Sequence, residues 1–232
     1  MLIDHTNDRV LEVLPQRDKA TVVAWLTQAR DSGLLAGLEE VTTDMWDGYV
    51  EAAKEVFGPQ VRITIDRFHV MQNFQACLNQ ARRQLQKQLP KELAAELKGT
   101  RWWWVTNPEN LEPHEREALD RLKERFPSLR ALSDQRQSLR AIFEDRAIRT
   151  AEEGMQKLRQ WREAALALGL TGLERFCKTL DNWLDKIANY FVSRSSNGQT
   201  EGFNHAIRAI LWRAFGLPNF KHLRLRILDA HG

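Results

Sequence analysis

The sequence has few cysteines, few prolines and little glycine. Its 232 residues include two Cys, seven Pro and twelve Gly, with 43% hydrophobic and 28% charged residues. This composition excludes a collagen-like chain, a disulfide scaffold and an intrinsically disordered protein. Cys77 and Cys177 stand far apart and show no C-x-x-C or Cys/His spacing, so we expect two reduced, buried thiols and no zinc site.

Long hydrophobic runs are also lacking. No segment approaches the roughly 18 uncharged apolar residues that a membrane span requires. The opening residues Met1–His5 carry neither the basic region nor the apolar region of a signal peptide. We therefore expect a folded cytoplasmic protein with no membrane partner, long enough for one core with an appended helical subdomain.

Net charge is small, but positive charge is concentrated near the C-terminus. The 34 Lys plus Arg exceed the 31 Asp plus Glu by only three, which does not establish a nucleic-acid partner. Between residues 194 and 226, however, Glu201 is the only acid. The basic residues there are Arg194, Arg208, Arg213, Lys221, Arg224 and Arg226. Such a run is typical of a solvated face or of a surface that binds a polyanion, and charge alone does not decide between them.

The first 70 residues alternate short apolar runs with helical patterns, which is typical of an α/β fold. Strands are expected at 9–14, 38–43 and 61–65, and helices at 18–32 and 46–57. Asp18 is the expected N-cap of the first helix, and Gly33 its end. The second helix lies between two short strands, so residues 38–65 should form a right-handed βαβ unit with parallel strands.

After Asp66 the pattern becomes helical and rich in charged residues and Leu, from residue 70 to about 192. This stretch predicts a long all-helical insertion. A last helix follows, on which His205, Arg208 and Trp212 share the face of Glu201, while the opposite face is apolar. We therefore divide the chain into residues 1–70, 71–192 and 193–232.

Asp44 and Asp66 each end a predicted strand. Sites in parallel α/β sheets are built at the carboxyl ends of the strands, so the two acids are a candidate metal-binding or acid–base pair. The alternative is structural, because Asp commonly follows a strand as the N-cap of a helix. The pattern alone leaves both open.

Several motifs, in this order, resemble the insertion-sequence transposases of the ISL-three type. They are Asp44-Met45-Trp46, the segment 65–70 (IDRFHV), the segment 196–204 (SNGQTEGFN), and Phe215-Gly216, Asn219-Phe220 and Arg226-Ile227-Leu228. The similarity covers nearly the whole chain. The D-R-F-H-V and S-N-x-x-T-E-x-x-N motifs are much more specific than a lone acidic pair.

The resemblance implies an RNase H-like core interrupted by the helical insertion, in which acidic residues hold two Mg²⁺ or Mn²⁺ ions for DNA cleavage and strand transfer. Asp44 matches the second catalytic aspartate and Glu201 the final catalytic glutamate, so both would be metal ligands. Mg²⁺ prefers oxygen ligands, and two ions roughly 4 Å apart would activate the attacking oxygen and stabilise the leaving one. Asp66 and His69 match as supporting residues, although His69 is equally well explained as a core histidine.

DNA at transposon ends and targets is the partner that the resemblance implies. The candidate contacts in the tail are Arg208, Arg213, Lys221, Arg224 and Arg226. Trp103, within the run Trp102–Trp104, is a candidate for stacking on unpaired bases, although most tryptophans are core residues. Arg82, Arg83 and Lys87 would track phosphates or form a solvated face. A homo-oligomer is compatible with the resemblance, but nothing in the chain itself indicates one.

The beginning of the chain departs from the family pattern. Family members carry a first catalytic aspartate on an opening strand ahead of a hairpin, and this chain begins at what resembles the hairpin. We therefore expect a partial core that lacks its first strand. Asp4 is a poor substitute, because one strand rather than two separates it from the helix that leads to Asp44.

Three functional hypotheses remain. The first is a DDE-type transposase domain that cleaves and transfers DNA with Mg²⁺, and the second is a truncated, inactive remnant that acts only as a DNA-binding or interaction module. The third is a helical interaction protein on which the motif match is accidental.

Overall fold

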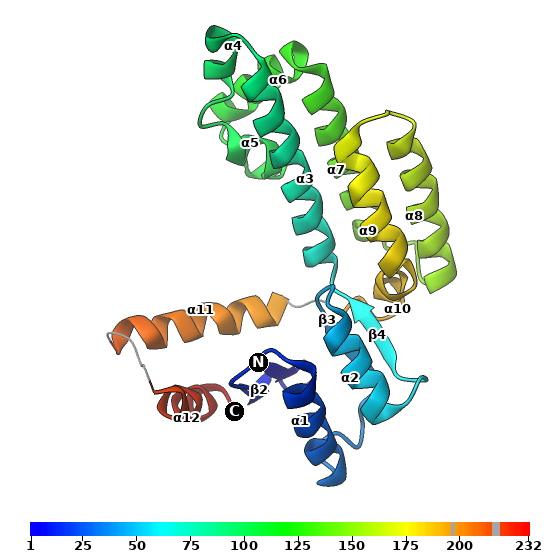
Figure 1. Ribbon diagram of the computed structural model, residues 1–232, viewed down its shortest axis with the longest axis vertical. Helices are drawn as coiled ribbons and strands as arrows, with labels where there is room; N and C mark the ends of the chain where they lie inside the picture. Colours follow the sequence, from blue (N-terminus) through cyan, green and yellow to red (C-terminus); the bar gives the residue numbers. More distant parts are fainter. Residues whose placement is uncertain (196–197, 215–218) are drawn as a thin grey trace. The chain divides into compact units, whose positions relative to one another are not determined.

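The computed structural model describes residues 1–195, 198–214 and 219–232 (Figure 1). The chain divides into two compact units, one of Met1–Phe68 with Ser195–Gly232 and the other of His69–Arg194. Each boundary lies two residues from the corresponding boundary in the sequence-based division.

The first unit begins with a hairpin and a helix. Strands β1 (Leu2–Asp4) and β2 (Arg9–Glu12) pair in antiparallel fashion. Helix α1 (Lys19–Asp31) follows, and Asp18 caps it by accepting a hydrogen bond from the backbone N–H of Thr21 at 2.8 Å. Gly33, with φ of 79°, ends the helix in the left-handed conformation that glycine adopts without strain. Both predicted helix ends are confirmed.

A βαβ unit comes next, made of β3 (Glu40–Thr43), α2 (Asp47–Phe57) and β4 (Arg62–Ile65). The two strands are parallel, as the sequence predicts. Helices α1 and α2 pack side by side (Figure 1). Their shared core consists of Val22, Leu26, Ala52 and Val56.

Among the described residues, the four strands form two separate two-stranded sheets, β1–β2 and β3–β4. The fold of this unit is therefore mixed α/β. The single mixed sheet of an RNase H-like core is not formed by the strands that the structure describes.

Two helices complete the first unit, α11 (Gly198–Arg213) and α12 (Phe220–His231). They pack against each other, with the ring centroids of Phe203 and His231 5.4 Å apart. On α11 the side chains of His205, Arg208 and Trp212 are exposed, whereas Phe203 and the apolar residues on its side are half-buried. The predicted amphipathic pattern is confirmed for these described side chains.

The second unit is helical throughout its described residues. Its elements are α3 (Arg67–Gln88), α4 (Lys91–Glu96), α5 (Arg101–Val105), the 3₁₀ helix η1 (Pro108–Asn110), α6 (Pro113–Arg125), α7 (Pro127–Glu144), α8 (Ala151–Leu166), α9 (Thr171–Ala188) and α10 (Tyr190–Ser193). The helical character agrees with the sequence pattern. No helix in the described part of the chain has both the length and the apolarity to cross a membrane.

Aromatic rings fill the core of the second unit. Phe74, Trp161 and Phe176 contact one another edge to face, and Phe143 stacks on Phe191 with ring centroids 5.7 Å apart. Both cysteines are free, with Cys177 buried and Cys77 half-buried. Burial raises the pKa of each thiol to about 11, so both are protonated near neutral pH.

Gly154 in α8 gives a test of this packing. A Cβ there would lie 2.0 Å from Cδ2 of Phe191, a ring held by its stacking on Phe143. We expect Gly154→Ala to destabilise the protein by about 1–3 kcal/mol through overpacking, despite the higher helix propensity of Ala. The measurement is urea unfolding followed by circular dichroism.

Gly202 in α11 is the matched control. Among the described residues, no atom lies within 4 Å of the Cβ that Gly202→Ala would add. We expect this variant to be neutral or stabilised by up to about 1 kcal/mol. Equal stability of Gly154→Ala and the parent protein would contradict the close packing.

Candidate functional site

Asp44 and Asp66 lie at the same edge of the β3–β4 sheet. The last residues of the two strands, Thr43 and Ile65, are paired. The backbone N–H of Asp66 donates to the carbonyl oxygen of Thr43 at 3.2 Å, which extends the ladder by one bond. The structure therefore brings together two acids that lie 22 positions apart in the sequence.

Each of these carboxylates has one bonded oxygen and one buried oxygen without a hydrogen-bond partner among the described residues. Asp66 is fully buried, and its Oδ1 accepts from the backbone N–H of Phe68 at 3.1 Å, which leaves Oδ2 unpartnered. In Asp44, Oδ2 accepts from Arg17 and Oδ1 is unpartnered. Burying an unsatisfied polar atom costs about 1–3 kcal/mol. Both oxygens fit the ligand type that a hard divalent cation prefers.

Arg17 is a residue of this site that sequence reasoning missed. It lies between β2 and α1, and its Nη2 donates to Asp44 Oδ2 at 2.7 Å. Its guanidinium carbon lies 5.2 Å from the ring centroid of Trp46 and 5.3 Å from that of Tyr49. The sequence feature that could have indicated a cation here is the pair Trp46 and Tyr49, spaced three residues apart soon after Asp44, since two such rings can hold a cation.

Glu201 belongs to α11, but its side chain lies outside the part that the structure describes, as do residues 196–197 of its motif and Phe215-Gly216 of another. Among the described residues, no group of three or more His, Cys, Asp or Glu side chains could hold a metal ion. The meeting of Asp44 with Glu201 stays a prediction. His69 is half-buried in the first turn of α3, and its supporting role also stays a prediction.

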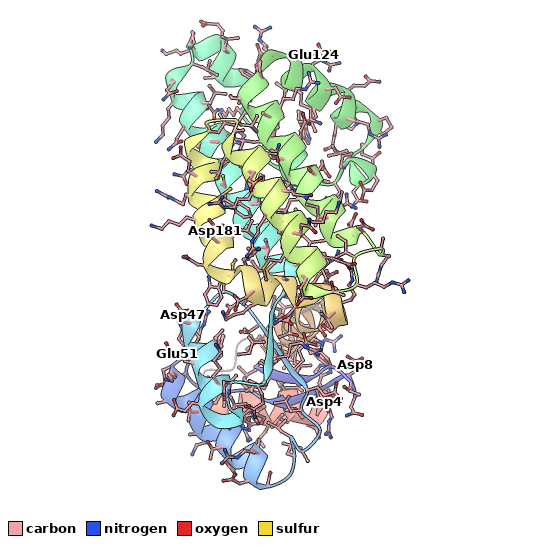
Figure 2. The ribbon with its side chains drawn as sticks, turned by 90° about the vertical axis from the view of Figure 1, so that its right-hand side faces the viewer. Asp4, Asp8, Asp47, Glu51, Glu124 and Asp181 are labelled. Atoms are coloured by element: carbon pink, nitrogen blue, oxygen red, sulfur yellow. The ribbon has the colours of Figure 1, made fainter. Side chains whose placement is uncertain are left out.

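Asp4 has a structural role in the β1–β2 turn, where Figure 2 labels it together with Asp8. Its carboxylate accepts hydrogen bonds from the side chain and backbone of Asn7, from the backbone of Thr6 and from the side chain of Arg9. These bonds, led by that from the Asn7 side chain, hold the pKa of Asp4 below its usual value. Both of its oxygens are engaged in shaping the turn, which agrees with its rejection as a substitute ligand.

The predicted basic tail divides into two kinds of residue. Arg208, Arg213, Lys221 and Arg226 are exposed. Arg224 instead donates from Nε and Nη2 to the two carboxylate oxygens of Glu12, at 2.6 and 2.5 Å. It thus ties α12 to β2, 212 positions away in the sequence. The DNA-binding assignment of all five stays a prediction.

Glu12 is the buried member of that ion pair, with 8% of its surface exposed. Burial by itself would raise the pKa of Glu12, but hydrogen bonds from Arg224 and from the backbone of Val13 outweigh burial and lower it. The folded state therefore favours the ionised carboxylate.

The tryptophan run of the insertion places its three side chains differently. Trp104 is buried, and Trp102 is 63% exposed with the guanidinium of Arg101 over its ring. Trp103 is half-buried and donates from Nε1 to Glu115 at 3.0 Å. It also lines a hollow of about 630 Å³ together with Glu96, Ala118, Arg121, Leu122, Glu124 and Arg125. Trp102 thus offers more ring surface for stacking than Trp103, whose DNA contact stays a prediction.

For Arg82 both sequence-based alternatives, a phosphate contact and a solvated face, are wrong. It is 7% exposed and donates to the carbonyl oxygen of Leu97 at 2.9 Å. Burial lowers the pKa of its guanidinium. Arg82 therefore joins α3 to the end of α4, whereas Arg83 is exposed.

Comparison with known proteins defines the class. A family model described as Transposase, of the DDE type, matches residues 1–227, which is almost the whole chain. The chain therefore belongs to the ISL3 family of DDE-type transposases. The match overturns the hypothesis of a helical interaction protein with accidental motifs.

A curated relative supports the same family. The chain is 25% identical over 233 residues to the transposase for insertion sequence element IS1001 of Bordetella parapertussis. The similar region covers 99% of this chain and 56% of that protein, so the chain spans little more than half the length of this relative. No solved structure matches the chain.

The ion pair between Glu12 and Arg224 gives a test of how α12 is held. We expect Glu12→Gln to destabilise the protein by about 1–3 kcal/mol, because a charge-assisted bidentate pair loses one charge in a largely buried setting. Thermal unfolding of the variant and the parent at pH 7 is the measurement. Asp134→Asn, at the exposed i,i+4 pair with Arg130, is a control that should change stability little.

The same pair predicts a pH dependence. Because the folded-state pKa of Glu12 is lowered, its stabilisation is complete above the ordinary pKa of about 4.3 and is lost as the pH falls through the folded value. The stability difference between parent and Glu12→Gln should therefore shrink from pH 7 to pH 3. An undiminished difference at pH 3 would show that the charge of Glu12 is not the cause.

Proposed function

We propose that the chain carries the catalytic domain of an insertion-sequence transposase, which cleaves DNA and transfers strands with divalent metal ions. The observation that carries the proposal is the pair of buried, unpartnered oxygens on Asp44 and Asp66 at one sheet edge. The proposal includes an RNase H-like core, to which the β1–β2 hairpin, the βαβ unit and the late helix α11 would contribute, with the helical unit inserted between β4 and α11.

Asp44 and Glu201 would hold the ions, Asp44 through Oδ1, which has no other partner among the described residues. Two bound Mg²⁺ or Mn²⁺ ions would activate the attacking water or 3′-hydroxyl and stabilise the leaving oxygen. Asp66 would support the site, since its Oδ1 accepts from the backbone N–H of Phe68 at the start of α3, while its buried Oδ2 has no hydrogen-bond partner among the described residues. His69, in the same first helical turn, would orient a ligand or contact a phosphate.

The exposed face of α11 supports DNA as the substrate. Arg208 is exposed and lies seven residues, which is about two turns of helix, after Glu201. Trp212, 82% exposed, follows Arg208 one turn further on. Lys221 and Arg226 add exposed positive charge on α12. DNA that reaches the acidic site would meet a basic, aromatic surface along the same helix.

A second candidate function is a DNA-binding module that does not cut DNA. The specific observation in its favour is the exposed positive charge of Arg208, Arg213, Lys221 and Arg226, which would bind DNA without any metal ion. Such a remnant would retain the basic face of α11 and α12 and would lack metal-dependent turnover.

Substitution of the two metal-binding acids tests the proposal. We expect Asp44→Asn and Glu201→Gln to lower cleavage by about 100-fold or more, because an amide cannot replace a charged carboxylate ligand. The assay expresses the full reading frame that encodes these residues and follows cleavage of the DNA that flanks it, with Mg²⁺ or Mn²⁺.

Asp47→Asn is the matched control. Asp47 is exposed in the first turn of α2, where Figure 2 labels it, only three residues beyond Asp44. This variant should retain cleavage. Full activity in Asp44→Asn or Glu201→Gln would refute the assignment. Salt-sensitive DNA binding without metal-dependent cleavage in the parent protein would favour the DNA-binding remnant. An absence of DNA binding at low salt would refute both proposed functions.

A further inference from the structure

Arg17 and Tyr49 lie outside the transposase motifs, and with Trp46 of the Asp44-Met45-Trp46 motif they form an arrangement beside Asp44. The guanidinium faces Asp44 from the connection between β2 and α1, and its side chain is 59% exposed. Trp46 and Tyr49 come from the start of α2 and pack edge to face, with ring centroids 4.4 Å apart and an interplanar angle of 85°. The guanidinium lies next to both rings.

Stability alone does not explain this arrangement. Exposed ion pairs and exposed cation–π contacts each contribute little to folding, because water screens them and the long side chain loses rotamer freedom. The rings of Trp46 and Tyr49 do restrict the conformations of the Arg17 side chain. They keep a permanent positive charge at the rim of the acidic site while leaving it accessible to solvent.

Asp44 has one carboxylate oxygen for the guanidinium of Arg17 and another for the proposed divalent ion. Oδ2 accepts from Arg17, whereas Oδ1 is buried and has no hydrogen-bond partner among the described residues. An ion bound at Oδ1 therefore need not displace the guanidinium. A DNA phosphate drawn to that ion would come within reach of the N–H donors of Arg17, whose planar fork matches phosphate oxygens.

We propose that Arg17 is a phosphate-binding residue of the transposase site, positioned beside Asp44 by Trp46 and Tyr49. The proposal rests on the proposed function. Arg17 would neutralise charge on the non-bridging oxygens of the phosphate under attack, where negative charge accumulates.

The test uses the 232-residue chain and a fluorescein-labelled DNA duplex, with binding measured by anisotropy over a range of KCl concentrations. We expect Arg17→Ala to weaken binding and to lower the slope of log K against log salt by about one, because one phosphate contact is lost. Arg17→Lys, which keeps the charge without the planar fork, should restore the slope but only part of the affinity. The melting temperature of both variants should stay within about 3 °C of the parent value.

Arg130→Ala is the matched control. Arg130 is 60% exposed and pairs with Asp134 on α7, so this variant removes the same charge at equal exposure. Its salt slope should equal that of the parent. Equal losses in Arg17→Ala and Arg130→Ala, or an unchanged slope in Arg17→Ala, would overturn the inference.

Binding of Mn²⁺ alone, followed by electron paramagnetic resonance, separates phosphate binding from support of Asp44. Arg17→Ala should bind Mn²⁺ at least as tightly as the parent, because a nearby positive charge has been removed. A loss of Mn²⁺ binding would assign Arg17 to positioning Asp44 and overturn the proposal. A parent chain that binds no DNA would refute the proposed function itself, whereas normal parent binding with an unchanged Arg17→Ala slope would refute only the role of Arg17.

Discussion

The parallel pairing of β3 with β4 is the constraint on which the candidate site depends. Its register sets Thr43 opposite Ile65 and so places the next residue of each strand, Asp44 and Asp66, at one edge. Because successive side chains point to opposite faces, a slip of one residue would separate the two acids. The buried side chain of Thr64 stabilises this register, since its hydroxyl donates a hydrogen bond to Glu40 on the neighbouring strand.

The acidic residues of the first unit differ in how many of their carboxylate oxygens accept hydrogen bonds. This difference distinguishes residues that stabilise the fold from candidate site residues. Glu12 accepts two hydrogen bonds from Arg224, and Asp4 accepts four from Thr6, Asn7 and Arg9. Asp44 and Asp66 each keep one buried oxygen without a partner among the described residues. The unsatisfied oxygens occur at the carboxyl ends of parallel strands, where α/β proteins bind ligands. Their energetic cost is consistent with a site that is completed by a cation.

Most helices and strands could be predicted from local sequence patterns. The Asp18 cap, the βαβ unit and the helical character of residues 69–194 follow from side-chain periodicity and capping chemistry, and each agrees with the structure. The family motifs indicate Asp44 as a site residue, and that role stays a prediction. The contacts of Arg17 with Asp44 and of Arg224 with Glu12 join positions 27 and 212 apart, and no periodic pattern encodes such pairs. Burial of Arg82 was missed for a related reason, because an arginine on a charged helix resembles a solvated one until its tertiary neighbours are known.

The proposed function requires Asp44 and Glu201, distant in the chain, to bind the same divalent ions. Iron-mediated hydroxyl-radical cleavage of the polypeptide tests it most directly, since Fe²⁺ in a Mg²⁺ site cuts only the backbone nearby. A shared metal site predicts cuts near both residue 44 and residue 201, which excess Mg²⁺ and Asp44→Asn would both suppress. Cuts near one of these positions alone, or at neither, would contradict a shared metal site.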